Sequence, residues 1–245
     1  RDDVESRGLG DVYKRQIPSL TSKHYPISFH GQRSEFGIFA GRCSSDASSP
    51  DVPCERQYYY TKDNFDSLEK LTKAHACVFA DSAPNIDAKQ GDELVTCIVD
   101  GGEGTSLTLA RSTDWFGTKS FATYKGGLIT DVSKIGSSSH YLVAIGSHLS
   151  DRTTSNVYVS YNGYDWDKVE FPTGTELSSG FTIVETTDNS LFVDVSYPNT
   201  KSVGQLFTSI GLNGSYFTKS LDYTHRDGFG NVDYEVVESI DGIVL

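Results

Sequence analysis

Side chains able to do chemistry are plentiful in this chain, but few of them form a recognisable set. Six arginines follow residue 16: Arg33, Arg42, Arg56, Arg111, Arg152 and Arg226. A sialidase needs several arginines converging on a substrate carboxylate, and a glycoside hydrolase needs two carboxylates at a defined separation. The 29 Asp and Glu residues that follow residue 16 supply candidates, but no motif selects a pair. We therefore expect no catalytic residue and no enzymatic activity, with a hydrolase kept as the alternative.

Metal and cofactor sites are not expected either. The four cysteines, Cys43, Cys54, Cys77 and Cys97, include no C-x-x-C pair, and the six histidines do not follow zinc-ligand spacing. Four cysteines allow three pairings. The hairpin-scale spacings favour Cys43–Cys54 and Cys77–Cys97, which would indicate an oxidising compartment. The alternative is four free thiols in a cytosolic protein.

Bulk composition excludes two classes of partner or location. The formal net charge of -12 argues against nucleic acid, because binding to phosphates requires clustered Lys and Arg. No run of about 18 apolar residues exists that could span a membrane. His140 and His148 flank an apolar segment and are candidates for sensing acidic pH, the alternative being solvated loop histidines.

Residues 1–16 are interpreted separately from the rest. The stretch RDDVESRGLGDVYKRQ, when back-translated, resembles the transposon-end adaptor of a sequencing library. We interpret 1–16 as a translated sequencing adaptor and exclude it from the fold. Residues 17–245 are then expected to be an internal fragment of one domain.

A repeat of about 49 residues runs through these residues. Thr61, Ser112, Ser160 and Ser209 occupy equivalent places in four similar segments, at separations of 51, 48 and 49 residues. Each unit contains short strands of alternating polarity, and helical periodicity is confined to FDSLEKLTKA at 65–74. Four-stranded units of this length are typical of β-propeller blades. The predicted fold is therefore all-β: a partial propeller of about four blades plus the start of another.

The turn after each equivalent residue approximates an Asp box. The third copy, SYNGYDW, ends at Trp166, and the second keeps Ser112 and Asp114 with Phe121 as the expected closing aromatic. The acidic or amide side chain caps backbone N–H groups, and the aromatic packs between blades. Asn162-Gly163 and Asn213-Gly214 predict hairpin turns with positive φ at both residues. The inner strand is expected at HYLVAIGS, covered on both faces.

Residues 24–245 resemble the luminal domain of the sortilin family, and the fungal vacuolar sorting receptors more than the animal ones. The segments that carry the resemblance are HYPISFHGQRSEFGIFAGRC, VYVSYNGYDWDKVEFP, ETTDNSLFVDV and NGSYFTKSL, together with the R..G.VD.E spacing that begins at Arg226. The resemblance implies a ten-bladed propeller. It also implies a type I membrane receptor, anchored outside this fragment, on the luminal side of Golgi and endosome membranes. Its partner would be a soluble vacuolar hydrolase such as carboxypeptidase Y, carried from the late Golgi to endosomes.

The resemblance also implies a ligand site. The positions that contact ligand in animal sortilin fall on segments 143–145, 155–157 and 180–182. They nominate Val143, Ile145, Val157, Phe181 and Thr182 as ligand-binding residues, all but Val157 on the tunnel side. The family arginine that pairs with a ligand carboxylate falls on or near Ser155, so Arg152 is the nearest substitute.

One modification site is expected. Asn213-Gly214-Ser215 forms an N-x-Ser/Thr sequon, and we expect Asn213 to be glycosylated in the lumen. The alternative is that these residues only form an Asn-Gly turn.

Overall fold

The structure of the chain is a computed structural model, and every regular element that it describes is a β-strand. It describes residues 27–43, 55–80, 93–101, 106–138, 140–147, 155–175, 181–187, 190–198, 200, 202–211, 213–227 and 232. The predicted adaptor at 1–16, as well as Cys54, His148 and Arg152, lies outside these residues.

Four four-stranded antiparallel sheets, the blades, account for sixteen of the described strands. Blade 1 contains β1 (Ser28–Phe29), β2 (Gly37–Cys43), β3 (Arg56–Thr61) and β4 (Glu69–Ala74). Blade 2 contains β5 (Ala76–Phe79), β6 (Val95–Asp100), β7 (Leu107–Ser112) and β8 (Ser120–Phe121). Blade 3 contains β11 (Val132–Ser138), β12 (Tyr141–Ser147), β13 (Ser155–Ser160) and β14 (Asp167–Lys168). Blade 4 contains β15 (Phe181–Thr187), β16 (Ser190–Ser196), β17 (Val203–Ile210) and β18 (Tyr216–His225).

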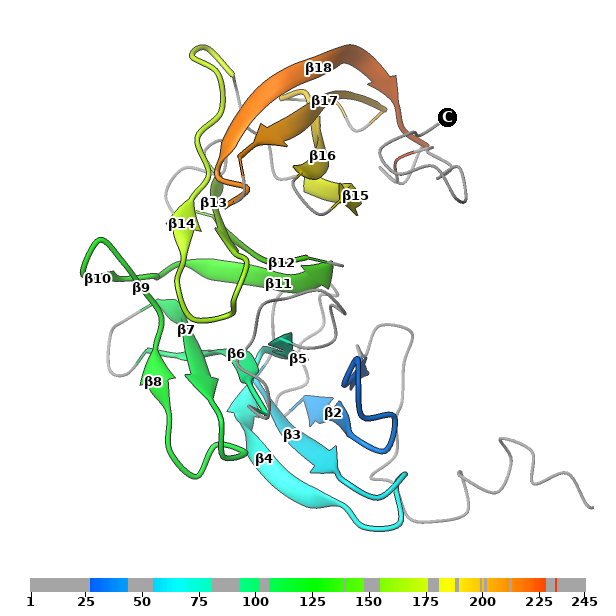
Figure 1. Ribbon diagram of the computed structural model, residues 1–245, viewed down its shortest axis with the longest axis vertical. Coiled ribbons are helices and arrows are strands. Elements are labelled where there is room, and N and C mark those ends of the chain that lie inside the picture. Colours follow the sequence, from blue (N-terminus) through cyan, green and yellow to red (C-terminus); the bar gives the residue numbers. More distant parts are fainter. Residues whose placement is uncertain are drawn as a thin grey trace, which may run out of the picture.

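The blades follow one another around an open arc (Figure 1). In each blade the strands pair in chain order, so the first and fourth strands form its two edges. The first strands, such as β5 and β15, lie on the inner side of the arc, and β4, β8, β14 and β18 lie on the outer side (Figure 1). A small hairpin of β9 (Thr123–Tyr124) and β10 (Gly127–Leu128) connects blades 2 and 3. The fold is therefore a partial β-propeller, as the repeat predicts.

The repeat marks the same point in every blade. Thr61, Ser112 and Ser160 are the last residues of the third strands β3, β7 and β13, and Ser209 is the penultimate residue of β17. The helical alternative at 65–74 is wrong, because Glu69–Ala74 forms β4 and pairs with β3. Pairing with a neighbouring strand overrides the weak helical pattern of so short a segment.

The hydrophobic core lies between blades, in three separate clusters. The first joins blades 1 and 2, the second joins blades 2 and 3, and the third joins blades 3 and 4. The strand β12 contributes to two of them, because Leu142 and Ala144 pack toward blade 2 while Tyr141 and Val143 pack toward blade 4. The continuously apolar sequence of this strand therefore reflects burial on both faces, as predicted.

The Asp-box turns are closed by side-chain hydrogen bonds to the backbone. In blade 2 the Ser112 hydroxyl donates to Asp114 Oδ1 at 2.7 Å, and the same oxygen accepts the Thr118 N–H at 2.9 Å. The pKa of the Asp114 carboxyl is lowered by the donated Thr118 N–H, by the Ser112 hydroxyl and by the Thr118 hydroxyl. In blade 3 Asn162 Oδ1 accepts the N–H groups of Tyr164 and Asp165, each at 2.8 Å. The predicted capping role is confirmed in both copies.

The aromatic residue that follows the turn differs from the prediction in blade 2. Phe121 is 37% exposed, so its expected role as the closing aromatic is wrong. Trp115 takes that role from within the turn, at φ 57°, and stacks on Tyr60 of blade 1 with ring centroids 4.3 Å apart. Trp166 is buried between blades 2 and 3, as predicted. A turn residue at positive φ is normally small, and burial of the large indole between the blades offsets that cost.

The two Asn-Gly turns hold only their glycines at positive φ, namely Gly163 at 75° and Gly214 at 67°. The prediction of positive φ at both asparagines is therefore wrong. Both glycines also lie against the preceding blade. A Cβ at Gly163 would meet Leu94 at 2.5 Å, and a Cβ at Gly214 would meet Tyr141 at 2.8 Å. Glycine is thus required for close approach of the blades as well as for the turn.

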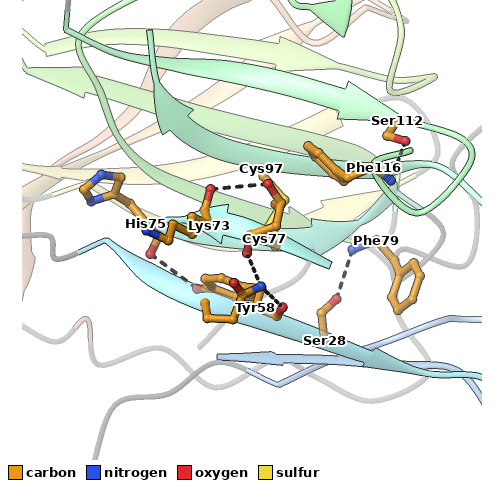
Figure 2. The surroundings of a disulfide bond; sticks show 11 residues. Ser28, Tyr58, Lys73, His75, Cys77, Phe79, Cys97, Ser112 and Phe116 are labelled. Atoms are coloured by element: carbon orange, nitrogen blue, oxygen red, sulfur yellow. Dashed lines mark hydrogen bonds between the residues drawn. A yellow bond between two sulfur atoms is a disulfide. The ribbon is translucent and has the colours of Figure 1, made fainter. Parts of the chain in front are cut away.

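A disulfide joins Cys77 to Cys97, one of the two predicted pairs, across the β5–β6 ladder. Figure 2 shows it beside Tyr58 of β3. Both cysteines are buried in the cluster between blades 1 and 2. A bond that closes a loop of this 20-residue separation restricts the unfolded chain and typically contributes about 3 kcal/mol. Burial raises the pKa of the Tyr58 hydroxyl to about 12.

An ion pair inside blade 4 has no counterpart in the predictions. Asp194 on β16 is fully buried and accepts hydrogen bonds from Arg226 Nε at 2.6 Å and from the Thr224 hydroxyl. The intervening strand β17 is crossed at Gly204, where a Cβ would lie 2.2 Å from Asp194 Oδ1. The glycine therefore makes room for the ion pair, which ties the end of β18 to β16.

Candidate ligand-binding site

The structure brings four of the predicted ligand-binding residues together. Val143 and Val157 belong to the cluster between blades 3 and 4, and Ile145 and Phe181 pack against it. Val143 and Ile145 lie on β12, Val157 on β13 and Phe181 on β15. The predicted segments therefore converge on one interface between two blades.

The tunnel-side orientation predicted for Val143 is wrong, and Val157 is buried as well. Val143 and Val157 are only 1% and 2% exposed, so they form core and not tunnel surface. The inner strand of blade 3 is β11, and β12 is the second strand. The sequence of β12 is continuously apolar because neighbouring blades cover both of its faces. A strand that lines a tunnel can have an equally apolar sequence, so the sequence alone does not distinguish the two positions.

Ile145 and Phe181 remain accessible at the edge of this interface. Both side chains are partly exposed, and they come from different blades. Thr182, also partly exposed, is the next residue on the inner strand β15, so its side chain points to the opposite face of blade 4. An apolar group could therefore contact Ile145 and Phe181 together, whereas Thr182 faces elsewhere.

Two residues on β11 complete this edge, and the sequence analysis did not identify them. Lys134 pairs with Ile145, and Gly136 pairs with Val143, so both lie on the blade face that is directed toward blade 4. Lys134 is exposed, and a Cβ built at Gly136 would meet nothing within 4 Å. The signal that could have found them is the seven-residue segment VSKIGSS, which forms the inner strand and is separated from HYLVAIGS by one serine.

The backbone of the inner strands is a further source of contacts. In the described part of the chain, β11 and β15 each pair on one side only, with β12 and β16. Their other edges carry N–H and C=O groups that are not used by the ladders. Unpaired strand edges bind extended peptides by adding a strand. The edge near Lys134, Ile145 and Phe181 thus combines apolar side chains, a cation and backbone hydrogen-bonding groups.

Three of the described arginines are each engaged separately and do not converge on one carboxylate-binding site of the sialidase kind. Arg33 is paired with Glu93 at 2.9 Å, Arg111 donates to the carbonyl oxygen of Tyr164, and Arg226 is buried with Asp194. These residues belong to blades 1, 2 and 4, and each guanidinium is engaged by its own neighbours. Among the side chains that the structure describes, no group of three or more His, Cys, Asp and Glu is placed to hold a metal ion.

Two further predicted sites stay predictions. Asn213 is partly buried, its side-chain N–H donates to Asp167 Oδ2 at 3.2 Å, and Ser215 is 3% exposed. Glycosylation at Asn213 stays a prediction. The Cys43–Cys54 bond also stays a prediction, because Cys54 lies outside the described residues. Within the described segments no helix is long and apolar enough to cross a membrane.

Known structures resemble this fold at low sequence identity. An acylaminoacyl peptidase from Pyrococcus horikoshii matches 84% of this chain and 34% of its own at a TM-score of 0.51 and 9% identity. An uncharacterized protein from Listeria monocytogenes matches 81% of this chain and 56% of its own at a TM-score of 0.50 and 12% identity. At such identities the likeness concerns the fold alone.

Proteins found by sequence share a higher identity with this chain than these structures do. A vacuolar protein sorting/targeting protein 10 from Emericella nidulans is 33% identical over 232 residues, which are 90% of this chain and 16% of that protein. The protein of the same name from Laccaria bicolor is 30% identical, over 93% of this chain and 16% of its own length. The chain thus spans about one sixth of these relatives. The model of the Sortilin-Vps10 family (sortilin, neurotensin receptor 3) matches residues 10–245. The chain therefore belongs to the Sortilin-Vps10 family.

Proposed function

We propose that this chain is part of the luminal ligand-binding region of a vacuolar sorting receptor that carries soluble hydrolases from the late Golgi to endosomes. Membership of the family and the names of the fungal relatives support this role. The membrane anchor of such a receptor would lie outside this chain. Carboxypeptidase Y is the cargo that the resemblance suggests for the first test.

The proposed cargo site is the inner edge of the interface between blades 3 and 4. The observation that supports it best is the convergence of Ile145 and Phe181, two partly exposed apolar side chains from different blades, beside the strand edges of β11 and β15. An extended cargo segment would add a strand there and place an apolar side chain between the blades. Val143 and Val157 would support the site from the core.

Lys134 gives the proposed site a charge preference. Its ammonium group is exposed, and its strand position faces Ile145 directly. In a chain of net charge -12 such a cation favours a carboxylate on the ligand. Lys134 and Arg152 are therefore the two candidates for recognising an acidic group.

The test is binding of purified carboxypeptidase Y precursor to the intact receptor, measured by biolayer interferometry. Phe181→Ala should weaken binding by roughly 1–3 kcal/mol, or about 5- to 150-fold in Kd, if the ring is a binding hot spot. Phe121→Ala is the matched control, because Phe121 is also partly exposed but lies on the outer strand β8 of blade 2. It should leave Kd unchanged.

Charge recognition is tested with Lys134→Glu and Arg152→Ala. Lys134→Glu should raise Kd and reverse its dependence on salt, because the attraction to an acidic ligand group becomes a repulsion that ions also screen. Normal binding by the Phe181, Lys134 and Arg152 variants would place the cargo site elsewhere. Cleavage of a sialoside or a β-glucan by the intact protein would instead show that it is a hydrolase.

A further inference from the structure

Tyr223, near the end of β18, has an uncommon backbone conformation for a large residue at the surface. It is the extra residue of a β-bulge, because its neighbours Asp222 and Thr224 pair with consecutive residues of β17. Its φ is 62°, and it is 78% exposed. Large residues rarely adopt positive φ, and strain of this kind is concentrated at functional positions.

Burial does not account for the conformation of Tyr223. The other aromatic residues at positive φ in the described part of the chain are Phe65, Trp115 and Phe116. These three are buried or partly buried and pack on other side chains, which offsets the cost of the backbone conformation. Tyr223 instead stacks on Tyr197 alone, with ring centroids 5.7 Å apart and 25° between the ring planes. At its high exposure the opposite face of the Tyr223 ring is open to solvent.

Two charged side chains lie beside this aromatic pair. The Tyr197 hydroxyl donates to Asp222 Oδ1 at 2.8 Å, and Lys219 Nζ lies 2.9 Å from the same oxygen. The hydrogen bond from Lys219, followed by that from Tyr197, lowers the pKa of the Asp222 carboxyl, so the group is ionised at neutral pH. Among the described contacts none uses Asp222 Oδ2, and the Lys219 ammonium keeps further N–H groups. We call Tyr197, Lys219, Asp222 and Tyr223 the tyrosine platform.

The tyrosine platform lies on an uncovered part of blade 4, whose outer edge is β18 (Figure 1). Lys219 pairs with Phe207, which is buried between blades 3 and 4, so Lys219 lies on the face directed toward blade 3. The outer strand of blade 3, β14, contains only two residues, and residues 218–223 of β18 are all exposed. Leu221 pairs with Leu206 on the opposite face. A blade packed on that opposite face would therefore leave the platform open.

We propose that the tyrosine platform binds a neutral pyranose sugar. The C–H face of a pyranose is weakly positive and would lie against the open face of Tyr223, whose π-system is negative. Neighbouring sugar hydroxyls both donate and accept hydrogen bonds, so one would donate to Asp222 Oδ2 and the next would accept from Lys219. Lys219 repels a cationic ligand and Asp222 repels an anionic one, which favours an uncharged ligand. This site is separate from the proposed cargo site at the inner edge of blades 3 and 4.

The test is saturation-transfer NMR of the intact protein with neutral trisaccharides of mannose, of glucose and of N-acetylglucosamine. At least one of them should bind, with the strongest transfer to the C–H protons on one face of a sugar ring. A glycoprotein that carries the same sugar is titrated in parallel, which distinguishes a glycan on a protein from a free sugar as the source of the ligand. Absence of binding in every arm would overturn the proposal.

Variants of the platform separate binding from folding. Tyr223→Gly should abolish sugar binding and keep the β17–β18 ladder protected from amide exchange, because glycine adopts positive φ without strain. Tyr223→Phe keeps the ring face and should retain the Kd of the unmodified protein. Asp222→Asn places an N–H group or an uncharged oxygen where Oδ2 was, and it should raise Kd by about 10-fold or more, the effect of losing a hydrogen bond to a charged acceptor.

Tyr216→Ala is the matched control, because Tyr216 is a 55% exposed tyrosine at the other end of β18. It should leave Kd for the sugar unchanged. Sugar binding that survives Tyr223→Gly, or that is lost equally in Tyr216→Ala, would overturn the proposal.

Discussion

Replacing Arg226 by methionine should destabilise blade 4 more than any exposed charge substitution. The guanidinium is 2% exposed, contacts Asp194 Oδ1 through Nε and Nη2 at 2.6 Å each, and donates from Nη2 to the Asp194 carbonyl oxygen at 2.8 Å. Methionine retains much of the apolar stem but none of these donors. Asp194 would remain fully buried and would keep the hydrogen bond from the Thr224 hydroxyl. Leaving a buried charge unpaired in this way costs about 3–5 kcal/mol.

The assay is urea-dependent hydrogen exchange of peptides that cover β16 and β18 in the intact protein, which reports the stability of this blade separately from the rest. Arg111→Met is the control, because Arg111 lies on β7 of blade 2 and bonds the Tyr164 carbonyl of blade 3; it should leave the exchange of β16 and β18 unchanged. The double variant Asp194→Leu/Arg226→Met should recover most of the lost stability, since no buried charge remains. A loss below about 1 kcal/mol for Arg226→Met, the range of exposed ion pairs, would refute the reasoning.

Other predictions concern the linkage, modification and autonomy of the chain. Peptide mapping without reduction should recover Cys43 and Cys54 in one cross-linked peptide, and separate recovery would exclude that bond. Mass mapping of the protein from a fungal host should find glycan on Asn213, and an unmodified asparagine throughout would contradict this. The pKa of Asp114 is lowered in the folded state, so the carboxylate stabilises the blade 2 turn fully above about pH 4 and less as the pH falls below that value. In an acid titration, Asp114→Asn should remove this decline. The isolated chain should aggregate or bind a hydrophobic dye, because the outer face of blade 4 exposes residues such as Tyr223, at 78%. A monomer with one sharp unfolding transition would argue against this.

The parts of the candidate site that could be predicted from sequence are those set by short-range pattern. Alternating polarity in SLFVDVS places Leu191 and Val193 on one face, and both are fully buried between blades 3 and 4. The place of Lys134 beside Ile145 could not be predicted, because it depends on which strand is the innermost of the blade. That order is fixed by pairing between strands and not by the composition of either one.

The sequence by itself determined that the chain is built of blades, because a spacing of 48–51 residues between Thr61, Ser112, Ser160 and Ser209 imposes one turn per unit. It also determined the capping of those turns, since Asp114 bonds residues no more than four positions away. Only the tertiary structure decided which aromatic fills the space between blades 1 and 2, and that Arg226 is buried with Asp194. Both depend on residues far apart in the chain meeting across a strand or an interface. A local pattern contains no information about the space left there, whereas packing density and the cost of an unpaired buried charge select the residue that fills it.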